Sequence, residues 1–237
     1  MLLYYVRHGD PIYKPDSLTP LGERQAEAVG HRLSQAGLDR VFSSPSHRAI
    51  LTAKPTCEML HLTPAEVAFA GENVAAKYFF SYLDQKRWIF QDPEIIPLFH
   101  STEVLSLGHE WYRYPAFAEH PRFSEGVAYY YDQVDAFFAE LGYEHERYTG
   151  RYRAVRSNQE HVALFAHAGF GMAFLSTLLD IPYPVVSSHF DMCHSGITVI
   201  HFDELDGYSY PKVLMLSSDG HLYRDGLPLY YNNELRI

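Results

Sequence analysis

The sequence predicts an α/β fold, a three-layer sandwich with a mostly parallel central sheet, helices on both faces and an aromatic-rich inserted cap. Two short apolar runs, Leu2–Val6 and Val162–Ala166, are typical of strands buried on both faces. Each run leads into a histidine, His8 and His167. Open α/β sheets bind ligands beyond the carboxyl ends of their strands, so we expect both histidines at one rim.

The length of the chain is suited to one α/β domain that carries a large insertion. Its 237 residues can bury a sizeable core. We therefore expect a single domain over residues 1–237, with the cap at about residues 71–123.

The elements after the first strand have clear start and stop signals. Residues 10–17 are polar and contain two prolines, which predicts a loop. Thr19 and Pro20 have the character of a helix N-cap and first helical position. The apolar spacing predicts a helix to about Ala36, closed by Gly37.

The next segment predicts strand, helix and strand. Residues 40–43 form a short strand, and residues 46–60 follow with helical spacing. Arg48 falls in the first turn of that helix. Residues 67–70 are a third candidate strand.

The middle of the chain is rich in aromatic residues. Twelve of the 46 residues from Tyr78 to Phe123 are aromatic, about a quarter, against 15% of the whole chain. Prolines at positions 93, 97, 115 and 121 interrupt any helical pattern. Such apolar bulk excludes a flexible linker.

The last part of the chain alternates helices and strands. We expect a helix over residues 123–141, a loop or hairpin over 142–158, a helix over 170–179 and strands at 196–202 and 212–217. The tail from Ser218 to Ile237 is turn-rich and aromatic, and its pattern does not place it.

Composition excludes several classes of partner. A net charge of −10 argues against a nucleic-acid or anionic-membrane surface. Only two cysteines, Cys57 and Cys193, argue against a disulfide framework. The chain begins on a core strand without a leader pattern and has no apolar run of about 18 residues. We expect a cytoplasmic protein.

Three motifs in order resemble the histidine phosphatase superfamily, the phosphoglycerate-mutase-like fold. The first is Arg7-His8-Gly9 at the end of the first strand. The second is Leu18-Thr19-Pro20-Leu21-Gly22 with Gln25-Ala26, and the third is Ser44-Pro45-Ser46-His47-Arg48-Ala49 with Thr52-Ala53. His167 stands where the family keeps its second histidine. These matches span roughly residues 1–56 and 160–202.

The resemblance implies phosphoryl transfer and gives each matching residue a role. His8 is then the nucleophile, because a neutral imidazole can attack phosphorus without prior activation. Arg7 and Arg48 form a guanidinium clamp on the phosphate oxygens, and His167 is a second donor there. Gly9 would let the backbone pass close to the phosphate.

The general acid is less well defined by the sequence. The family places it after the second arginine helix, and Glu72 fits because it follows the candidate strand at residues 67–70. Glu66 precedes that strand and would lie at its wrong end. Glu103 and Glu110 lie inside the insertion and remain alternatives.

The chain also departs from the family pattern. The loop after Gly9 has Asp10-Pro11 and Asp16-Ser17 where the mutase branch has threonine and asparagine, and Ala168 replaces the usual glycine. The acidic motif before a Gly-x-Trp stretch is absent as such. The first and third departures favour the phosphatase branch over phosphoglycerate mutase.

We expect no cofactor and no metal. The chain has 14 histidines, but His189, Asp191 and His194 fall in an expected loop without ligand spacing, and no HExxH or CxxC motif occurs. The remaining histidines of polar segments are expected to be solvated.

The leading interpretation is a metal-independent phosphomonoester hydrolase that forms phosphohistidine at His8 and acts on a small phosphorylated substrate. A phosphoglycerate-mutase-like phosphotransferase and a catalytically silent phospho-ligand binder on the same fold are the alternatives. The family's inserted helices and loops cover the site, which would give residues 71–123 a role in substrate choice; plain core packing is the competing interpretation. The substrate and a homodimer are left open.

Overall fold

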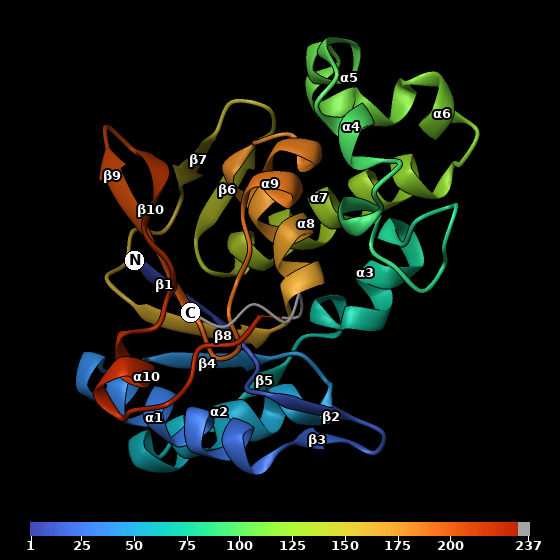
Figure 1. The fold of residues 1–237 in the computed structure, drawn as a ribbon. Coiled ribbons are helices and arrows are strands. Elements are labelled where there is room, and N and C mark those ends of the chain that lie inside the picture. Colours follow the sequence, from blue (N-terminus) through green and yellow to red (C-terminus); the bar gives the residue numbers. More distant parts are fainter. Residues whose placement is uncertain (232–237) are drawn as a thin grey trace.

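The fold is built on one eight-stranded mixed sheet, seen in the computed structural model, which describes residues 1–231 (Figure 1). In sheet order its strands are β5 (Ala65–Glu66), β4 (Arg40–Ser43), β8 (His161–Ala166), β1 (Leu2–Arg7), β9 (Ile197–Leu205), β10 (Tyr208–Ser218), β7 (Arg151–Ala154) and β6 (Tyr143–Glu146). β9 and β7 run opposite to the six other strands. β5, β4, β8 and β1 are neighbouring parallel strands, so their carboxyl ends meet at one edge.

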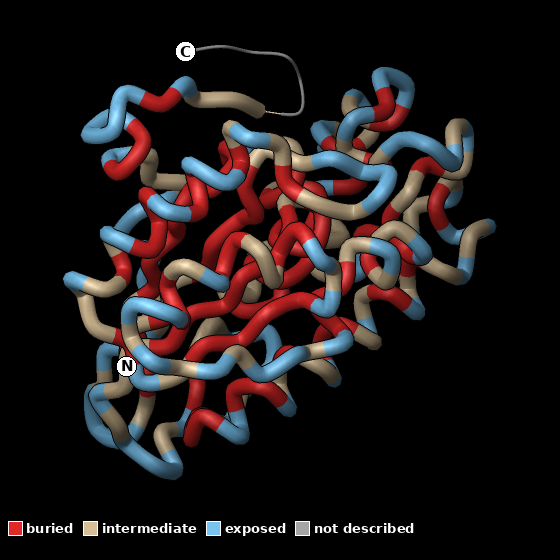
Figure 2. The backbone as a smooth tube through the Cα atoms, turned by 90° about the horizontal axis from the view of Figure 1, so that it is seen from below, coloured by how far each residue is buried: buried red, intermediate tan, exposed pale blue. Residues whose placement is uncertain are grey.

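Helices cover both faces of the sheet, which confirms the predicted α/β class. One layer holds α1 (Pro20–Ala36), α2 (His47–Leu60) and the short α10 (Gly220–Arg224), and the other holds α7 (Arg122–Glu140), α8 (Ala168–Leu179) and α9 (Tyr183–His189) (Figure 1). Strand β8 is apolar from Val162 onward because Ala163 and Phe165 face the first layer while Val162 and Leu164 face the second. The buried residues accordingly run through the middle of the molecule in Figure 2.

Residues 71–123 form a set of short helices beside the second layer (Figure 1). They are α3 (Glu72–Phe79), the 3-10 helices η2 (Ile89–Gln91) and η3 (Gly108–Arg113), α4 (Ile96–Phe99), α5 (Thr102–Ser106) and α6 (Pro115–Ala118). Tyr183 of α9 stacks on Phe79 and Trp111 at ring-centroid distances of 4.5 and 5.7 Å. The aromatic side chains thus join this segment to the second helix layer.

The predicted helix signals act as expected. The side chain of Thr19 accepts a hydrogen bond from the Gly22 amide at 3.0 Å, and Pro20 opens α1. Gly37 follows the helix with a positive φ of 70°. The predictions for α2, α7, the β6–β7 hairpin, α8, β9 and β10 are likewise confirmed, with both last strands longer than expected.

Three local predictions were wrong. Residues 67–70 form no strand. The neighbouring strand β4 ends at Ser43, whose carbonyl oxygen accepts a hydrogen bond from the Val67 amide, and Ala68–Ala70 then form the 3-10 helix η1. Residues 10–17 are not a plain loop, because β2 (Pro11–Tyr13) pairs with β3 (Asp16–Leu18) as a hairpin. His189 ends helix α9 and does not lie in a loop, because Pro182 is the N-cap of that helix and Pro184 stands in its first turn.

The tail that the sequence left unplaced crosses back over the first helix layer. Leu222 of α10 and Leu227 pack with Ala28 of α1. Residues 232–237 of the tail lie outside the described residues. None of the described helices has the length and apolar character that crossing a membrane requires.

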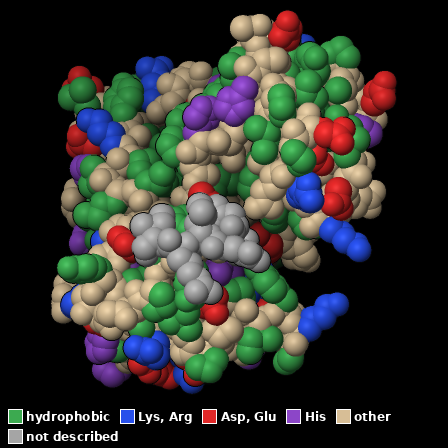
Figure 3. Space-filling model, viewed as in Figure 1, with side chains coloured by type: hydrophobic (Ala, Val, Ile, Leu, Met, Phe, Trp, Pro, Cys, Tyr) green, Lys and Arg blue, Asp and Glu red, His purple; other side chains and the backbone are tan. Residues whose placement is uncertain are grey.

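Charged side chains are dispersed over the face shown in Figure 3. Lysine and arginine side chains stand apart from one another, with acidic groups between them (Figure 3). This face offers no continuous basic patch.

Candidate active site

Three parallel strands bring polar residues to one edge of the sheet. His8 follows β1, Ser44 follows β4 and His167 follows β8. The register pairs Arg7 with Ala166 and Ser43 with Phe165, so the residues after them lie side by side. The His8 and His167 rings are 5.1 Å apart, centroid to centroid. The sequence prediction that both histidines share one rim is therefore confirmed.

The surroundings of His8 determine its tautomer. Its Nδ1 atom lies 2.7 Å from the carbonyl oxygen of Gly9. A carbonyl oxygen can only accept, so Nδ1 carries the proton and Nε2 keeps its lone pair. Burial, and then the neighbouring His167, Arg7 and Arg48, lower the pKa of His8 well below the ordinary value. His8 is thus a neutral imidazole with an available Nε2.

Gly9 allows its segment to approach helix α1 closely, a contact that the sequence did not reveal. A Cβ atom on Gly9 would lie 2.6 Å from the carbonyl oxygen of Gly22 in α1. The Gly9 amide donates to Thr52 of α2 at 3.0 Å. The segment after the nucleophile is therefore held against both helices of the first layer.

Two buried arginines flank the histidines. The guanidinium of Arg7 donates to the carbonyl oxygen of Met192. Arg48, in the first turn of α2, donates from Nη2 to His167 Nδ1 at 3.0 Å and from Nη1 to Asp16 Oδ1 at 2.8 Å. The second contact was not foreseen: Asp16 also accepts from the His47 amide at 2.8 Å, so a carboxylate occupies the start of α2.

Both ring nitrogens of His167 make hydrogen bonds, one with Arg48 and one with Ser44. Because its Nδ1 accepts from Arg48, Nε2 carries the proton and donates to Ser44 Oγ at 2.8 Å. Burial, and then Arg48 and Arg7, lower the pKa of His167 well below the ordinary value. Ser44 was present in the sequence motif but received no role; its position directly after a buried strand was the available signal.

Glu72 lies at the start of α8. Its two carboxyl oxygens accept from the amides of Gly169 and Phe170 at 3.2 and 3.0 Å. Burial raises the pKa of Glu72, against the lowering effects of these amides and of Arg48 and Arg7. The residue thus reaches the site, although as the first residue of α3 and not at a strand end as expected.

The other acidic candidates lie away from this environment. Glu66, Glu103 and Glu110 are exposed, and Glu110 pairs with Arg113 at 2.7 Å. Of the four glutamates weighed from the sequence, only Glu72 is partly buried beside the arginines.

Comparison with known proteins agrees with this arrangement. Residues 3–68, which include Arg7, His8 and Arg48, match the sequence profile of the histidine phosphatase superfamily (branch 1). The match covers just over a quarter of the chain, the part that holds three of the predicted site residues. No curated protein sequence matches significantly.

Solved structures of phosphatases share the fold of this chain over nearly its whole length. A phosphoserine phosphatase mutant from Entamoeba histolytica, in complex with phosphoserine, is 18% identical with a TM-score of 0.61, covering 93% of this chain and 98% of the other. A mycobacterial glucosyl-3-phosphoglycerate phosphatase is 17% identical with a TM-score of 0.56, covering 92% and 98%. A putative alpha-ribazole-5'-P phosphatase from Escherichia coli is 18% identical with a TM-score of 0.55, covering 92% and 96%.

The segment of residues 71–123, the predicted cap, places the Trp88 side chain next to the site. The Trp88 indole lies directly over Gly169, where a Cβ atom would be 2.2 Å from the indole ring. Phe80 and Phe90 pack on Trp88 at centroid distances of 4.8 and 5.7 Å. Trp88 thus stands beside the same helix start that Glu72 binds.

Other cap aromatics are core residues. Trp111 is 1% exposed and packs among Phe99, Phe117 and Phe123. Tyr78 is buried against Gly126 of α7. The cap therefore combines a site-facing part with ordinary core packing.

Among the described residues, no three His, Cys, Asp or Glu side chains are grouped to hold a metal ion. The catalytic and phosphate-binding roles given to His8, Glu72, His167, Arg7 and Arg48 remain predictions, argued further below.

Proposed function

We propose that this protein is a metal-independent phosphomonoester hydrolase that acts through phosphohistidine at His8 on a small phosphorylated metabolite. One observation carries the proposal: the neutral His8 ring has its Nε2 lone pair free and lies among Arg7, Arg48 and His167. The superfamily profile and the phosphatase fold support the same activity class.

In the first step, Nε2 of His8 attacks phosphorus and the bond from phosphorus to the ester oxygen breaks. Arg7 and Arg48 would balance the charge on the phosphoryl oxygens, and neutral His167 would donate from Nε2–H to one of these oxygens in place of its contact with Ser44. Glu72 gives its proton to the leaving oxygen. Each of its oxygens keeps a second lone pair beside the α8 amide contact, so either one can carry that proton.

In the second step, water attacks the phosphohistidine and returns His8 to its neutral form. Glu72, now a carboxylate, takes the proton of the attacking water, and inorganic phosphate leaves. Since the pKa of Glu72 is raised by burial, the group can both donate and accept this proton.

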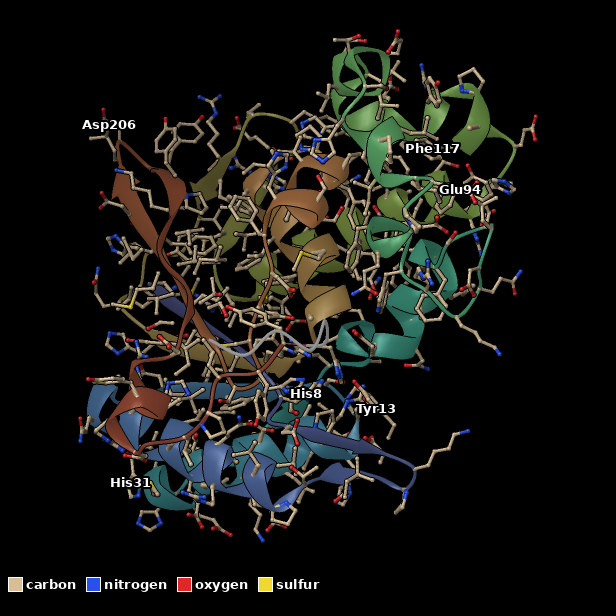
Figure 4. All side chains as sticks on the ribbon, viewed as in Figure 1. His8, Tyr13, His31, Glu94, Phe117 and Asp206 are labelled. Atoms are coloured by element: carbon tan, nitrogen blue, oxygen red, sulfur yellow. The ribbon has the colours of Figure 1, made fainter. Side chains whose placement is uncertain are left out.

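The test is phosphate release from an aryl phosphate in the presence of EDTA, together with acid-labile labelling by the substrate phosphate. The wild type should release phosphate and take up label, and His8→Ala should do neither. His31→Ala, which removes an exposed histidine of α1, is the matched control (Figure 4). Labelling that persists in His8→Ala would refute the mechanism.

The same preparation separates the two alternatives. Exchange of phosphate with a diphosphorylated donor, without release, would identify a mutase. Binding of phosphate without release or exchange would identify a silent phospho-ligand binder.

A further inference from the structure

A third histidine lies beside the nucleophile. His194, in the segment between α9 and β9, is 5% exposed. Its ring stacks on the His8 ring at a centroid distance of 5.8 Å and an interplanar angle of 29°. The His8 ring is therefore in contact with both the His167 and the His194 rings. The proposed mechanism uses only the first of these two neighbours.

The Asp10 carboxylate lies next to the third histidine. Its Oδ1 atom lies 3.2 Å from Nδ1 of His194, within ion-pair distance. The other oxygen, Oδ2, accepts from the Thr19 hydroxyl at 2.6 Å, and the Asp10 amide donates to Gln25 at 2.8 Å. Thr19 and Gln25 belong to the start of α1, so the Asp10 carboxylate is fixed by a rigid element.

The backbone on either side of His194 is also tied down. The Ser195 amide donates to the carbonyl oxygen of His8 at 3.0 Å, and the His194 amide donates to the carbonyl oxygen of Tyr230 at 2.9 Å. The segment that carries His194 therefore holds the nucleophile by its main chain as well as by its ring.

We propose that His194 and Asp10 form a positioning pair for His8, an inference that rests on the proposed function. The His194 ring limits rotation of the His8 ring, and Asp10 limits movement of His194. The His8 ring then keeps the orientation in which Nδ1 donates to Gly9 and Nε2 faces the phosphoryl group. Small misplacement of a reacting atom commonly lowers a rate by ~10²-fold, so such support matters for turnover.

The first part of the test compares the activity of variants that have an aromatic ring at position 194 with that of a variant that lacks one. His194→Ala should lower kcat at least ~10-fold and leave the inhibition constant of inorganic phosphate within about twofold, because phosphate contacts are kept. His194→Phe, which restores a ring without the Asp10 contact, should recover part of the lost kcat. Asp10→Asn should give an intermediate kcat. Unchanged kcat in His194→Ala, or a loss confined to KM, would overturn the proposal.

The second arm needs no turnover. In nitrogen-15 histidine spectra, His8 of the wild type should show one tautomer with the proton on Nδ1. His194→Ala should convert this signal to a mixture of tautomers and leave the His167 signal unchanged. A single His8 tautomer in His194→Ala would overturn the inference. If the wild type released no phosphate, the proposed function would fail while this spectrum still decided the positioning role. His194→Gln replaces His194→Ala if the alanine variant does not fold.

Discussion

The Arg48 guanidinium is bound to the Asp16 carboxylate, with Nη1 2.8 Å from Oδ1. Asp16 belongs to the β2–β3 hairpin, and the Tyr13 ring of the same hairpin lies 5.5 Å from the Arg48 Cζ atom. A carboxylate at a proposed phosphate site opposes the binding of an anion. We therefore expect the β2–β3 hairpin to lower the affinity of the site for phosphate.

Asp16→Asn should strengthen the inhibition by inorganic phosphate about fivefold. Removing a partly exposed negative charge near a bound dianion is worth on the order of 1 kcal/mol. The asparagine oxygen can still accept from the His47 amide, so the start of α2 is kept. Inhibition constants measured at equal ionic strength check this. Asp39→Asn removes an exposed charge that precedes β4, at the opposite edge, and should have no effect. Weaker inhibition in Asp16→Asn would show that Asp16 supports phosphate binding.

Glu72→Gln should slow hydrolysis of alkyl or sugar phosphates by ~10²-fold or more and leave aryl phosphates much less affected. A poor leaving group needs the proton, whereas a phenolate departs without it. Rates on a series of leaving groups give the measurement. Glu110→Gln, an exposed glutamate of the cap, is the matched control. An equal loss across the series would place the acid elsewhere.

Trp88 and Trp111 should respond differently to substitution. Trp88→Ala should change the preference among substrates more than the rate on a small aryl phosphate, because the indole lies at the start of α8 beside Glu72. Trp111→Ala should instead lower the free energy of unfolding by ~3–5 kcal/mol, since this side chain is a core residue. Substrate panels and denaturant melts separate the two effects. The prediction fails if Trp88→Ala loses activity equally on every substrate and melts at a lower temperature.

His145 should make stability depend on pH. It lies between Asp135 and Asp180, with nitrogen-to-oxygen distances of 2.7 and 3.0 Å, and its side chain is buried. The expectation that His145, in a polar segment, is solvated was therefore wrong. Burial lowers the pKa of His145, but hydrogen bonds to Asp135 and Asp180 and their charges outweigh it, so the pKa is raised. A raised pKa gives stability that is complete below the unfolded value of about 6.5 and is lost as pH rises through the folded value.

Denaturant melts on either side of neutral pH measure this effect. The wild type should lose stability as the pH increases above about 6.5, and His145→Gln should be less stable at the acid end and lose most of that slope. A slope that stays the same in His145→Gln would assign it to another group. His61→Gln, an exposed histidine after α2, is the control.

The sequence allowed the strands and the main site residues to be predicted because their signals are local. A buried apolar run followed by Arg7-His8-Gly9 marks both a strand and the chemistry at its end. Thr19 and Pro20 mark a helix start by capping alone. His167 could be aligned with His8 because parallel neighbours share a carboxyl edge.

The remaining contacts depend on segments that are distant in sequence. Nothing near Asp16 indicates that it faces Arg48, and nothing near Asp10 indicates His194. Glu72 follows the second arginine helix as expected, but the 3-10 helix η1 and not a strand at residues 67–70 leads to it, and α8 of a distant segment supplies its partners. Pairings of this kind arise from tertiary packing, which short patterns do not encode.

The close approach of the Gly9 segment to Gly22 of α1 restricts which substitutions these two positions can accept. A Cβ atom on Gly22 would lie 2.2 Å from the carbonyl oxygen of Asp10. The Asp10 backbone therefore leaves no room for a side chain at position 22, and the Gly22 backbone leaves none at position 9. A shift of the segment that carries His8 would therefore require a matching shift of α1. The Trp88 indole lies against Gly169 at the start of α8 as a side-chain contact. We therefore expect the segment around Trp88 to tolerate substitution more readily than Gly9 and Gly22 do.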